Sequence, residues 1–141
     1  MEDDRTEPKR LLIVDDDEAI TSSLASLLGS DAVVVRTAST WEHAVELLQT
    51  QTFDLVITDL RLSGTMGMEG LELISMIKTR LPQTRVVLLT GYGSPEVERQ
   101  ARERGADAYL DKTLPISMLV ERVRALGLSM DSAGSERRCS A

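Results

Sequence analysis

The feature of this 141-residue chain that most restricts its fold is a set of five short apolar runs. The runs occupy residues 11–14, 32–35, 55–57, 86–89 and 108–110. Most are rich in β-branched residues, and their apolar residues are continuous rather than alternating with polar ones. Strands buried on both faces of a parallel sheet have this pattern, so we expect the runs to be the strands of one sheet.

The segments that separate and follow these runs have helical spacing. Apolar residues recur on one helical face in residues 20–28, 41–48, 71–81 and 116–123. The expected faces include Leu27 in the first segment and Ile116 in the last. Residues 95–105 show a weaker pattern, in which only Val97 and Ala101 are apolar.

Residues with capping preferences mark the ends of several of these segments. The candidates at helix starts are Asp17, Ser39 with Glu42 as a capping box, and Ser94 followed by Pro95. The candidates just beyond helix ends are Gly29 and Gly105.

Strands that alternate with helices predict a doubly wound α/β fold of (βα)5 type, with a five-stranded parallel sheet and helices on both faces. We expect this domain to occupy residues 10–127. Residues 1–9 are charged and predict a flexible leader. Residues 128–141 are small and polar and predict a disordered tail or the start of a linker.

Composition excludes several classes of function. The net charge is −7 and aromatic residues make up 3%, which disfavours direct nucleic-acid binding. No apolar run approaches the roughly 20 residues that span a bilayer, and the N-terminus has no signal-peptide pattern. Cys139 is the single cysteine, so no internal disulfide can form. We expect a cytoplasmic protein with no membrane partner.

In such sheets the binding crevice lies beyond the carboxyl ends of the strands. The residues that follow the first, third, fourth and fifth runs there are Asp15, Asp16, Asp17, Glu18, Thr58, Asp59, Thr90, Asp111 and Lys112. If Asp15, Asp16 and Asp59 converge, Lys112 offsets only part of their charge, and the oxygen ligands favour Mg²⁺ or Mn²⁺. A carboxylate beside such an ion, a lysine and a hydroxyl suits phosphoryl transfer.

The segments LLIVDDDEAI, LVITDLRL, VVLLTGYGS and GADAYLDK resemble the receiver domain of two-component response regulators. The resemblance covers about residues 10–127 and implies the flavodoxin-like strand order 2-1-3-4-5. It implies that Asp59 is the phosphoacceptor. It also implies that Asp15 and Asp16 hold Mg²⁺ together with Asp59 and the backbone carbonyl of Arg61.

The same resemblance implies roles for three further residues. Thr90 is the expected switch hydroxyl, Lys112 the lysine that pairs with the phosphoryl group, and Tyr109 the aromatic residue that changes rotamer with Thr90. For Tyr109, simple packing on a strand near the sheet edge is the alternative. The chain departs from the family pattern in having Ser63 for a proline, in a longer 63–70 loop, and in having Thr113 after Lys112. A cis peptide after Lys112 is therefore not carried over.

The resulting hypothesis is a signalling module rather than a metabolic enzyme, which catalyses only its own phosphorylation and dephosphorylation. The expected donor is a histidine kinase or a histidine phosphotransfer protein. The expected output surface comprises the fourth helix, the fifth strand and the fifth helix, and it contacts a protein partner, an output domain or a second receiver. Arg99, Arg102 and Arg104 are either a partner-binding face or part of a solvated helix.

Three other functions remain open from the sequence. An aspartate-nucleophile phosphohydrolase of the haloacid-dehalogenase type would use the Asp15-x-Asp17 pattern. A flavodoxin-like cofactor binder fits less well, because three aspartates would repel a phosphate. A degenerate receiver that acts only as a scaffold is the remaining alternative.

Overall fold

The computed structural model describes residues 7–62, 69–91 and 93–128. Its sheet has five parallel strands in the order β2-β1-β3-β4-β5. The strands are β1 (Lys9–Val14), β2 (Val33–Ala38), β3 (Leu55–Thr58), β4 (Arg85–Thr90) and β5 (Ala108–Asp111). This topology confirms the predicted doubly wound fold and its strand order.

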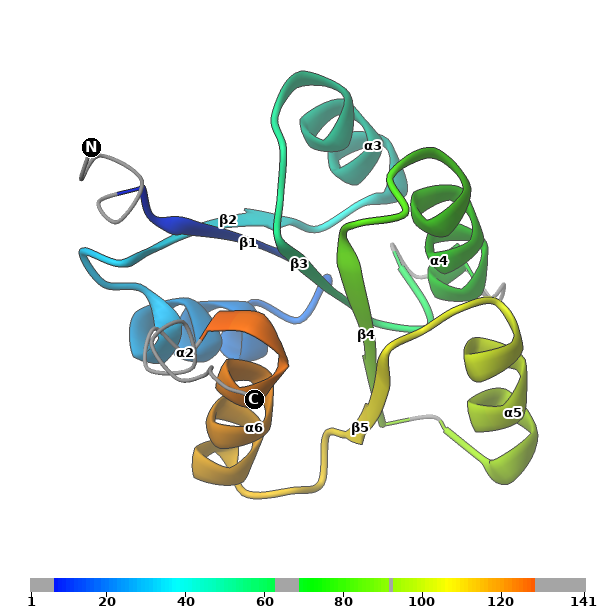
Figure 1. The fold of residues 1–141 in the computed structure, drawn as a ribbon. Coiled ribbons are helices and arrows are strands. Elements are labelled where there is room, and N and C mark those ends of the chain that lie inside the picture. The colour runs from blue at the N-terminus through cyan, green and yellow to red at the C-terminus, as the bar shows by residue number, and fades with distance from the viewer. Residues whose placement is uncertain (1–6, 63–68, 92, 129–141) are drawn as a thin grey trace, which may run out of the picture.

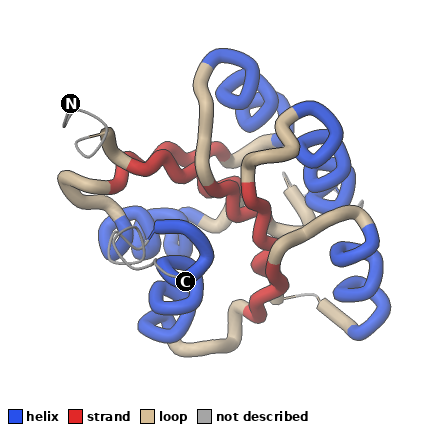
Figure 2. The backbone as a smooth tube through the Cα atoms, viewed as in Figure 1, coloured by secondary structure: helices blue, strands red, loops and turns tan. Residues whose placement is uncertain are grey.

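Helices cover both faces of the sheet (Figure 1). They are α2 (Glu18–Leu28), α3 (Trp41–Thr50), α4 (Glu69–Arg80), α5 (Pro95–Glu103) and α6 (Ile116–Val123), followed by the turn η1 (Arg124–Leu128). Helices α2 and α6 pack on one face, and α3, α4 and α5 pack on the other (Figure 1). Figure 2 shows the strands enclosed between these two layers, so the sheet is the centre of the molecule.

Two apolar cores, one on each face, explain why the strand sequences are continuous in apolar residues. Along β1, Leu12 and Val14 belong to the core beneath α3, α4 and α5. Leu11 and Ile13 belong to the core beneath α2 and α6. All four side chains are fully buried. Because successive side chains of a strand point to opposite faces, a strand covered on both sides needs apolar residues at every position.

Capping was predicted correctly at two helix starts. The Asp17 carboxylate accepts hydrogen bonds from the backbone N–H groups of Ala19 and Ile20 at the start of α2. The Ser94 hydroxyl accepts one from the Val97 N–H at the start of α5, where Pro95 is the first helical residue. These bonds satisfy N–H groups that have no partner within the helix.

At helix α3 the predicted capping box is wrong by one residue. The N-cap is Thr40, and its hydroxyl accepts a hydrogen bond from the His43 N–H. Gly29 caps the end of α2 with an extended backbone, and Gly105 follows α5 with a φ of 108°.

Some residues expected on apolar faces are exposed. Leu27 is 46% exposed and Ile116 is 36% exposed, although both fit a helical apolar pattern. The pattern places each at the edge of the buried stripe, where α2 and α6 meet solvent. Strand β2 also extends further than its apolar run, through the exposed Arg36 and Thr37, because an edge strand tolerates polar residues that a central strand does not.

The predicted domain limits are only partly covered by the described residues. Strand β1 begins at Lys9, which is one residue inside the expected leader. Residues 1–6, the tail from residue 129, Tyr92 and most of the altered loop (63–68) lie outside the described residues. In the described part of the chain no peptide bond is cis, and this includes the bond between Lys112 and Thr113. No helix in that part has the length and apolar character required to cross a membrane.

A matched pair of substitutions in α2 tests the packing. Leu24 is fully buried whereas Leu27 is largely exposed. We expect Leu24→Ala to lower the free energy of unfolding by about 3 kcal/mol, since it leaves a cavity in the core. Leu27→Ala should lower it by less than about 1 kcal/mol. Urea unfolding measures both values, and equal losses would contradict the described packing of α2.

Candidate functional site

The candidate site lies at the carboxyl ends of the parallel strands, where polar residues follow three of the strands. Asp15 follows β1, Asp59 follows β3 and Lys112 follows β5. In the register of the sheet, Val14 lies opposite Thr58. Asp15 and Asp59, the residues that follow them, are therefore adjacent at the ends of β1 and β3. The Asp59 N–H donates to the Val14 carbonyl, which extends this pairing to the site itself.

The first two acidic residues after β1 join Asp59 in one cluster. Asp15, Asp16 and Asp59 each place a carboxylate oxygen within 4.8 Å of the others. Asp15 and Asp59 are buried, while Asp16 is exposed. Such oxygens are the ligands that hard divalent cations prefer, so the cluster can hold one. Asp17 is engaged as the cap of α2, which argues against the phosphohydrolase alternative that needed it in the site.

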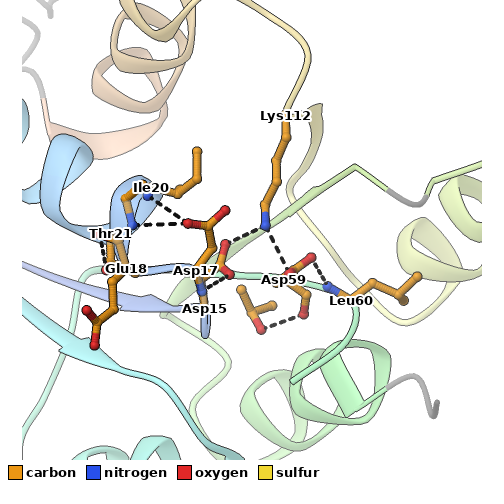
Figure 3. A network of polar contacts seen from close by, with 10 residues as sticks. Asp15, Asp17, Glu18, Ile20, Thr21, Asp59, Leu60 and Lys112 are labelled. Carbon is orange, nitrogen blue, oxygen red and sulfur yellow. Dashed lines mark hydrogen bonds and ion pairs between the residues drawn. The ribbon is translucent and has the colours of Figure 1, made fainter. Parts of the chain in front are cut away.

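Lys112 bridges the two buried carboxylates (Figure 3). Its ammonium nitrogen lies 2.8 Å from Asp15 Oδ2 and 3.0 Å from Asp59 Oδ2. The lysine side chain is itself 16% exposed, so these ion pairs are largely shielded from water. One ammonium faces three carboxylates, and the site therefore keeps an excess of negative charge.

Backbone N–H groups hold both carboxylates in place. The Leu60 N–H donates to Asp59 Oδ1 at 2.7 Å, and the Asp17 N–H donates to Asp15 Oδ1 at 2.9 Å. Each buried carboxylate thus uses one oxygen for a backbone donor and the other for Lys112 (Figure 3). The spacing of acidic residues did not predict the Leu60 donor, because every residue except proline has a backbone N–H and the type of side chain does not show where it points.

Burial and charge alter two of these ionisations. Burial raises the pKa of Asp15 to about 6, and the negative charge of Asp59 adds to this effect, while hydrogen bonds from Lys112 and the Asp17 N–H oppose it. Burial alone lowers the pKa of Lys112, but the hydrogen bonds and charges of Asp15 and Asp59 outweigh it and raise the pKa above its usual value. The lysine therefore stays protonated near neutral pH.

Gly70, near the start of α4, lets this helix approach the Asp59 connection closely. Its N–H donates to the Leu60 carbonyl at 2.9 Å. A Cβ at this position would lie 2.1 Å from the Asp59 carbonyl oxygen, a distance that no real side chain shows. The helix and the connection can therefore pack in this way only with glycine. The strand-end argument did not identify Gly70, because its role depends on contact between distant backbone segments.

The predicted switch residues lie together at the ends of β4 and β5. Thr90 is fully buried. The Tyr109 hydroxyl receives a hydrogen bond from the Ser94 N–H and lies over Gly93, where an added Cβ would be 1.5 Å from it. That same Cβ would lie 3.3 Å from the Thr90 methyl group. Burial, together with the charges of Asp111 and Glu98, raises the pKa of Tyr109. Tyr109 therefore contacts the connection that follows Thr90.

The arginines of α5, and Arg104 directly after the helix, do not form an open basic surface. Arg99 pairs with Glu96 and Glu103 on its own helix, and Arg102 pairs with Glu98. Arg104 donates to the Ser75 hydroxyl and to the Leu71 carbonyl. These contacts favour the interpretation of α5 as a solvated helix with balanced charge. A dedicated site for an acidic partner is not supported.

The position of the Arg61 carbonyl remains a prediction. Arg61 follows Asp59 by two residues, and its side chain is exposed.

The strand order and the acidic cluster agree with one protein family, which sequence comparison identifies. The model for the response regulator receiver domain matches residues 11–124, and the chain belongs to this family. Response regulator receiver domains are signalling modules, and the present chain contains one. The predicted fold class, family and receiver function are thereby confirmed.

Individual relatives agree with this assignment. The chain is 38% identical to the response regulator protein PilR of Pseudomonas aeruginosa over 115 residues, which cover 82% of this chain and 25% of PilR. It thus spans about a quarter of the length of that relative.

Solved structures agree as well. A CheY-like receiver domain protein from Methanospirillum hungatei has a TM-score of 0.78 at 30% identity, with 91% of this chain and 100% of that chain covered. A Burkholderia pseudomallei response regulator, solved with a phosphorylated aspartic acid, calcium ion and citrate, has a TM-score of 0.72 at 30% identity. The match covers 92% of this chain and 73% of that one.

The raised pKa of Asp15 predicts how stability depends on pH. Between about pH 6 and pH 4 the folded protein holds a proton on Asp15 that the unfolded chain, with its ordinary pKa of 3.8, does not. The contribution of this group to stability therefore rises as the pH falls through 6. We expect Asp15→Asn to raise the free energy of unfolding at pH 7 by about 2 kcal/mol and to flatten this part of the pH profile.

The measurement is urea unfolding between pH 4 and 7.5 in the absence of divalent cations. The exposed Asp31→Asn serves as the control, since it removes an acid outside the site and should leave the profile unchanged. A wild-type slope that survives in Asp15→Asn would assign the effect to another group.

Gly70→Ala tests the contact between α4 and the Asp59 connection. The new Cβ meets backbone atoms that cannot rotate away, so we expect a loss of about 1–3 kcal/mol in the free energy of unfolding. Gly91→Ala is the matched control, because its Cβ would be 3.8 Å from the nearest side chain, an ordinary contact. If thermal unfolding shows both variants to be equally stable, the close approach at Gly70 is not present in solution.

Proposed function

We propose that the chain accepts a phosphoryl group on the carboxylate of Asp59 from a histidine kinase or a histidine phosphotransfer protein. The observation that carries this proposal is the position of the Lys112 ammonium, which contacts both buried carboxylates of a cluster with excess negative charge. A lysine at this point can pair with a phosphoryl oxygen as it arrives beside Asp59. The phosphorylated aspartic acid in the Burkholderia relative supports the same chemistry.

In the proposed transfer, an Asp59 oxygen bonds to phosphorus while the bond from phosphorus to the donor's imidazole nitrogen breaks. The electron pair of that bond stays on the nitrogen. The Leu60 N–H keeps the Asp59 carboxylate oriented, and Lys112 offsets negative charge on the phosphoryl oxygens. In dephosphorylation, water would attack phosphorus while the bond from phosphorus to the Asp59 oxygen breaks. Inorganic phosphate would leave, and the electron pair of that bond would return to the Asp59 carboxylate. The chain would thus catalyse its own phosphorylation and dephosphorylation and no metabolic reaction.

We assign the acidic cluster to Mg²⁺ or Mn²⁺. The carboxylates of Asp15, Asp16 and Asp59 and the carbonyl of Arg61 would hold the ion. The fit rests on the donor set, which is all oxygen, and on the charge that Lys112 leaves uncompensated. When bound, such a cation supplies positive charge next to the phosphoryl oxygens.

We further propose that Thr90 and Tyr109 couple Asp59 to an output surface on α5, β5 and α6. Thr90 ends β4 directly before the connection to α5, and Tyr109 contacts that connection at Gly93 and Ser94. Helix α5 is anchored by only two buried side chains, Val97 and Ala101, so a small shift of the connection can displace it.

The partners of this surface follow from the same proposal. A downstream protein or output domain would use it, and so would a second receiver in a homodimer. The excess of acidic residues argues against direct contact with nucleic acid. We place this activity in the cytoplasm, where histidine kinases present their phosphorylated histidine.

Incubation with a small acyl phosphate and Mg²⁺ tests the phosphoacceptor. We expect intact-mass measurement to show one added phosphoryl group, which is lost when Mg²⁺ is removed with a chelator. Asp59→Asn should abolish the addition, and the exposed Asp31→Asn should not change it. Labelling that persists in Asp59→Asn would exclude Asp59 as acceptor, and a wild-type protein that takes up no phosphoryl group would favour a scaffold receiver.

A further inference from the structure

The position of Lys112 requires an explanation, because lysine is a long and flexible side chain. Its ammonium must hold a fixed place between Asp15 and Asp59, although free rotation of a lysine side chain favours many other conformers. Strand β5 ends at Asp111, one residue before the lysine. The sheet alone therefore does not fix the backbone on both sides of Lys112.

Toward the sheet, one hydrogen bond holds the lysine. The Lys112 N–H donates to the Thr90 carbonyl at 3.2 Å, which continues the pairing of β4 with β5. Past the lysine, the next residue is Thr113, which has no ring to restrict its φ angle.

On the other side of the lysine, Asp111 forms a small turn with Thr113 and Leu114. Asp111 Oδ1 accepts two hydrogen bonds from Thr113, one from its N–H and one from its hydroxyl, each at 2.8 Å. The Asp111 carbonyl accepts a third from the Leu114 N–H at 3.1 Å. Lys112 lies between the residues that these bonds join, so the bonds fix the backbone on both sides of it. The two bonds from Thr113 also lower the pKa of Asp111, so its carboxylate is ionised and a strong acceptor near neutral pH.

We propose that Asp111 and Thr113 are positioning residues that hold the Lys112 ammonium between Asp15 and Asp59. The proposal rests on the proposed phosphoryl transfer, since it assigns these residues to the lysine that serves it. Both side chains are exposed and neither touches the acidic cluster in the described contacts, so their effect on the site passes through the backbone of Lys112.

Loosening this turn should change two properties of the site in opposite directions. A displaced lysine offsets less charge on an arriving phosphoryl group, so transfer slows. The same displacement removes a positive charge that repels cations from Asp15 and Asp59, so Mg²⁺ binds more tightly. General damage to the site would instead weaken both properties. The opposite signs therefore separate a positioning role from a structural one.

The test compares Asp111→Ala with Asp111→Asn. Both variants lose the same charge, but only asparagine retains an oxygen that can accept the bonds from Thr113. A second pair compares Thr113→Val, which lacks the hydroxyl, with Thr113→Ser, which keeps it. The measurements are the initial rate of phosphoryl uptake from an acyl phosphate at saturating Mg²⁺ and the affinity for Mg²⁺ by calorimetry, with urea unfolding to establish that each variant is folded.

We expect Asp111→Ala to slow phosphoryl uptake roughly tenfold. Its affinity for Mg²⁺ should rise about threefold. Thr113→Val should move both values in the same directions but less far, and the asparagine and serine variants should stay close to wild type. Uptake at the wild-type rate in Asp111→Ala, or a joint fall of uptake and Mg²⁺ affinity, would overturn the proposal. If the wild-type chain takes up no phosphoryl group, the proposed function fails, while the difference in Mg²⁺ affinity between Asp111→Ala and Asp111→Asn still decides the positioning role.

Discussion

The ion pairs of Lys112 with Asp15 and Asp59 are the interaction on which the rest of this site depends. Two buried carboxylates at this distance repel each other, and burial makes the repulsion stronger than it would be in water. Lys112 reduces this cost, and the backbone donors of Leu60 and Asp17 reduce it further. The compensation is incomplete, as the raised pKa of Asp15 indicates. The remaining negative charge is what suits the site to a cation and to phosphoryl chemistry.

The sheet supplies the geometry that this interaction needs. β1 and β3 are neighbours, so Asp15 and Asp59 lie at the same edge of the sheet. Lys112 follows β5, which is two positions from β3 and three from β1 in the sheet. The lysine is long enough to reach across, whereas a shorter side chain at the end of β5 would not be. Apolar cores on both faces of the sheet keep the strand ends rigid. The stability gained from the two apolar cores therefore offsets the repulsion between the buried carboxylates of Asp15 and Asp59.

Sequence patterns predicted the elements well where one local property decides the structure. The continuous apolar runs identified all five strands, because burial on both faces leaves few alternatives. Asp17 and Ser94 were recognised as caps from their side chains alone. Prediction failed where contacts in the folded chain decide whether a side chain is buried or paired. Periodicity could not tell that the Leu27 side chain is 46% exposed, nor that Arg99 and Arg102 of α5 pair within their own helix.

By itself, the sequence determined the alternation of strands and helices, the acidic residues after β1 and β3, and the lysine after β5. These features depend on residue type and order, which any reader of the chain can see. The tertiary structure alone decided that Asp15 is buried while Asp16 is exposed, although both belong to the same acidic cluster. It also decided the close approach of Gly70 to the Asp59 connection. The physical reason is that these features are set by distances between backbone segments, and such distances exist only once the sheet has brought the segments together.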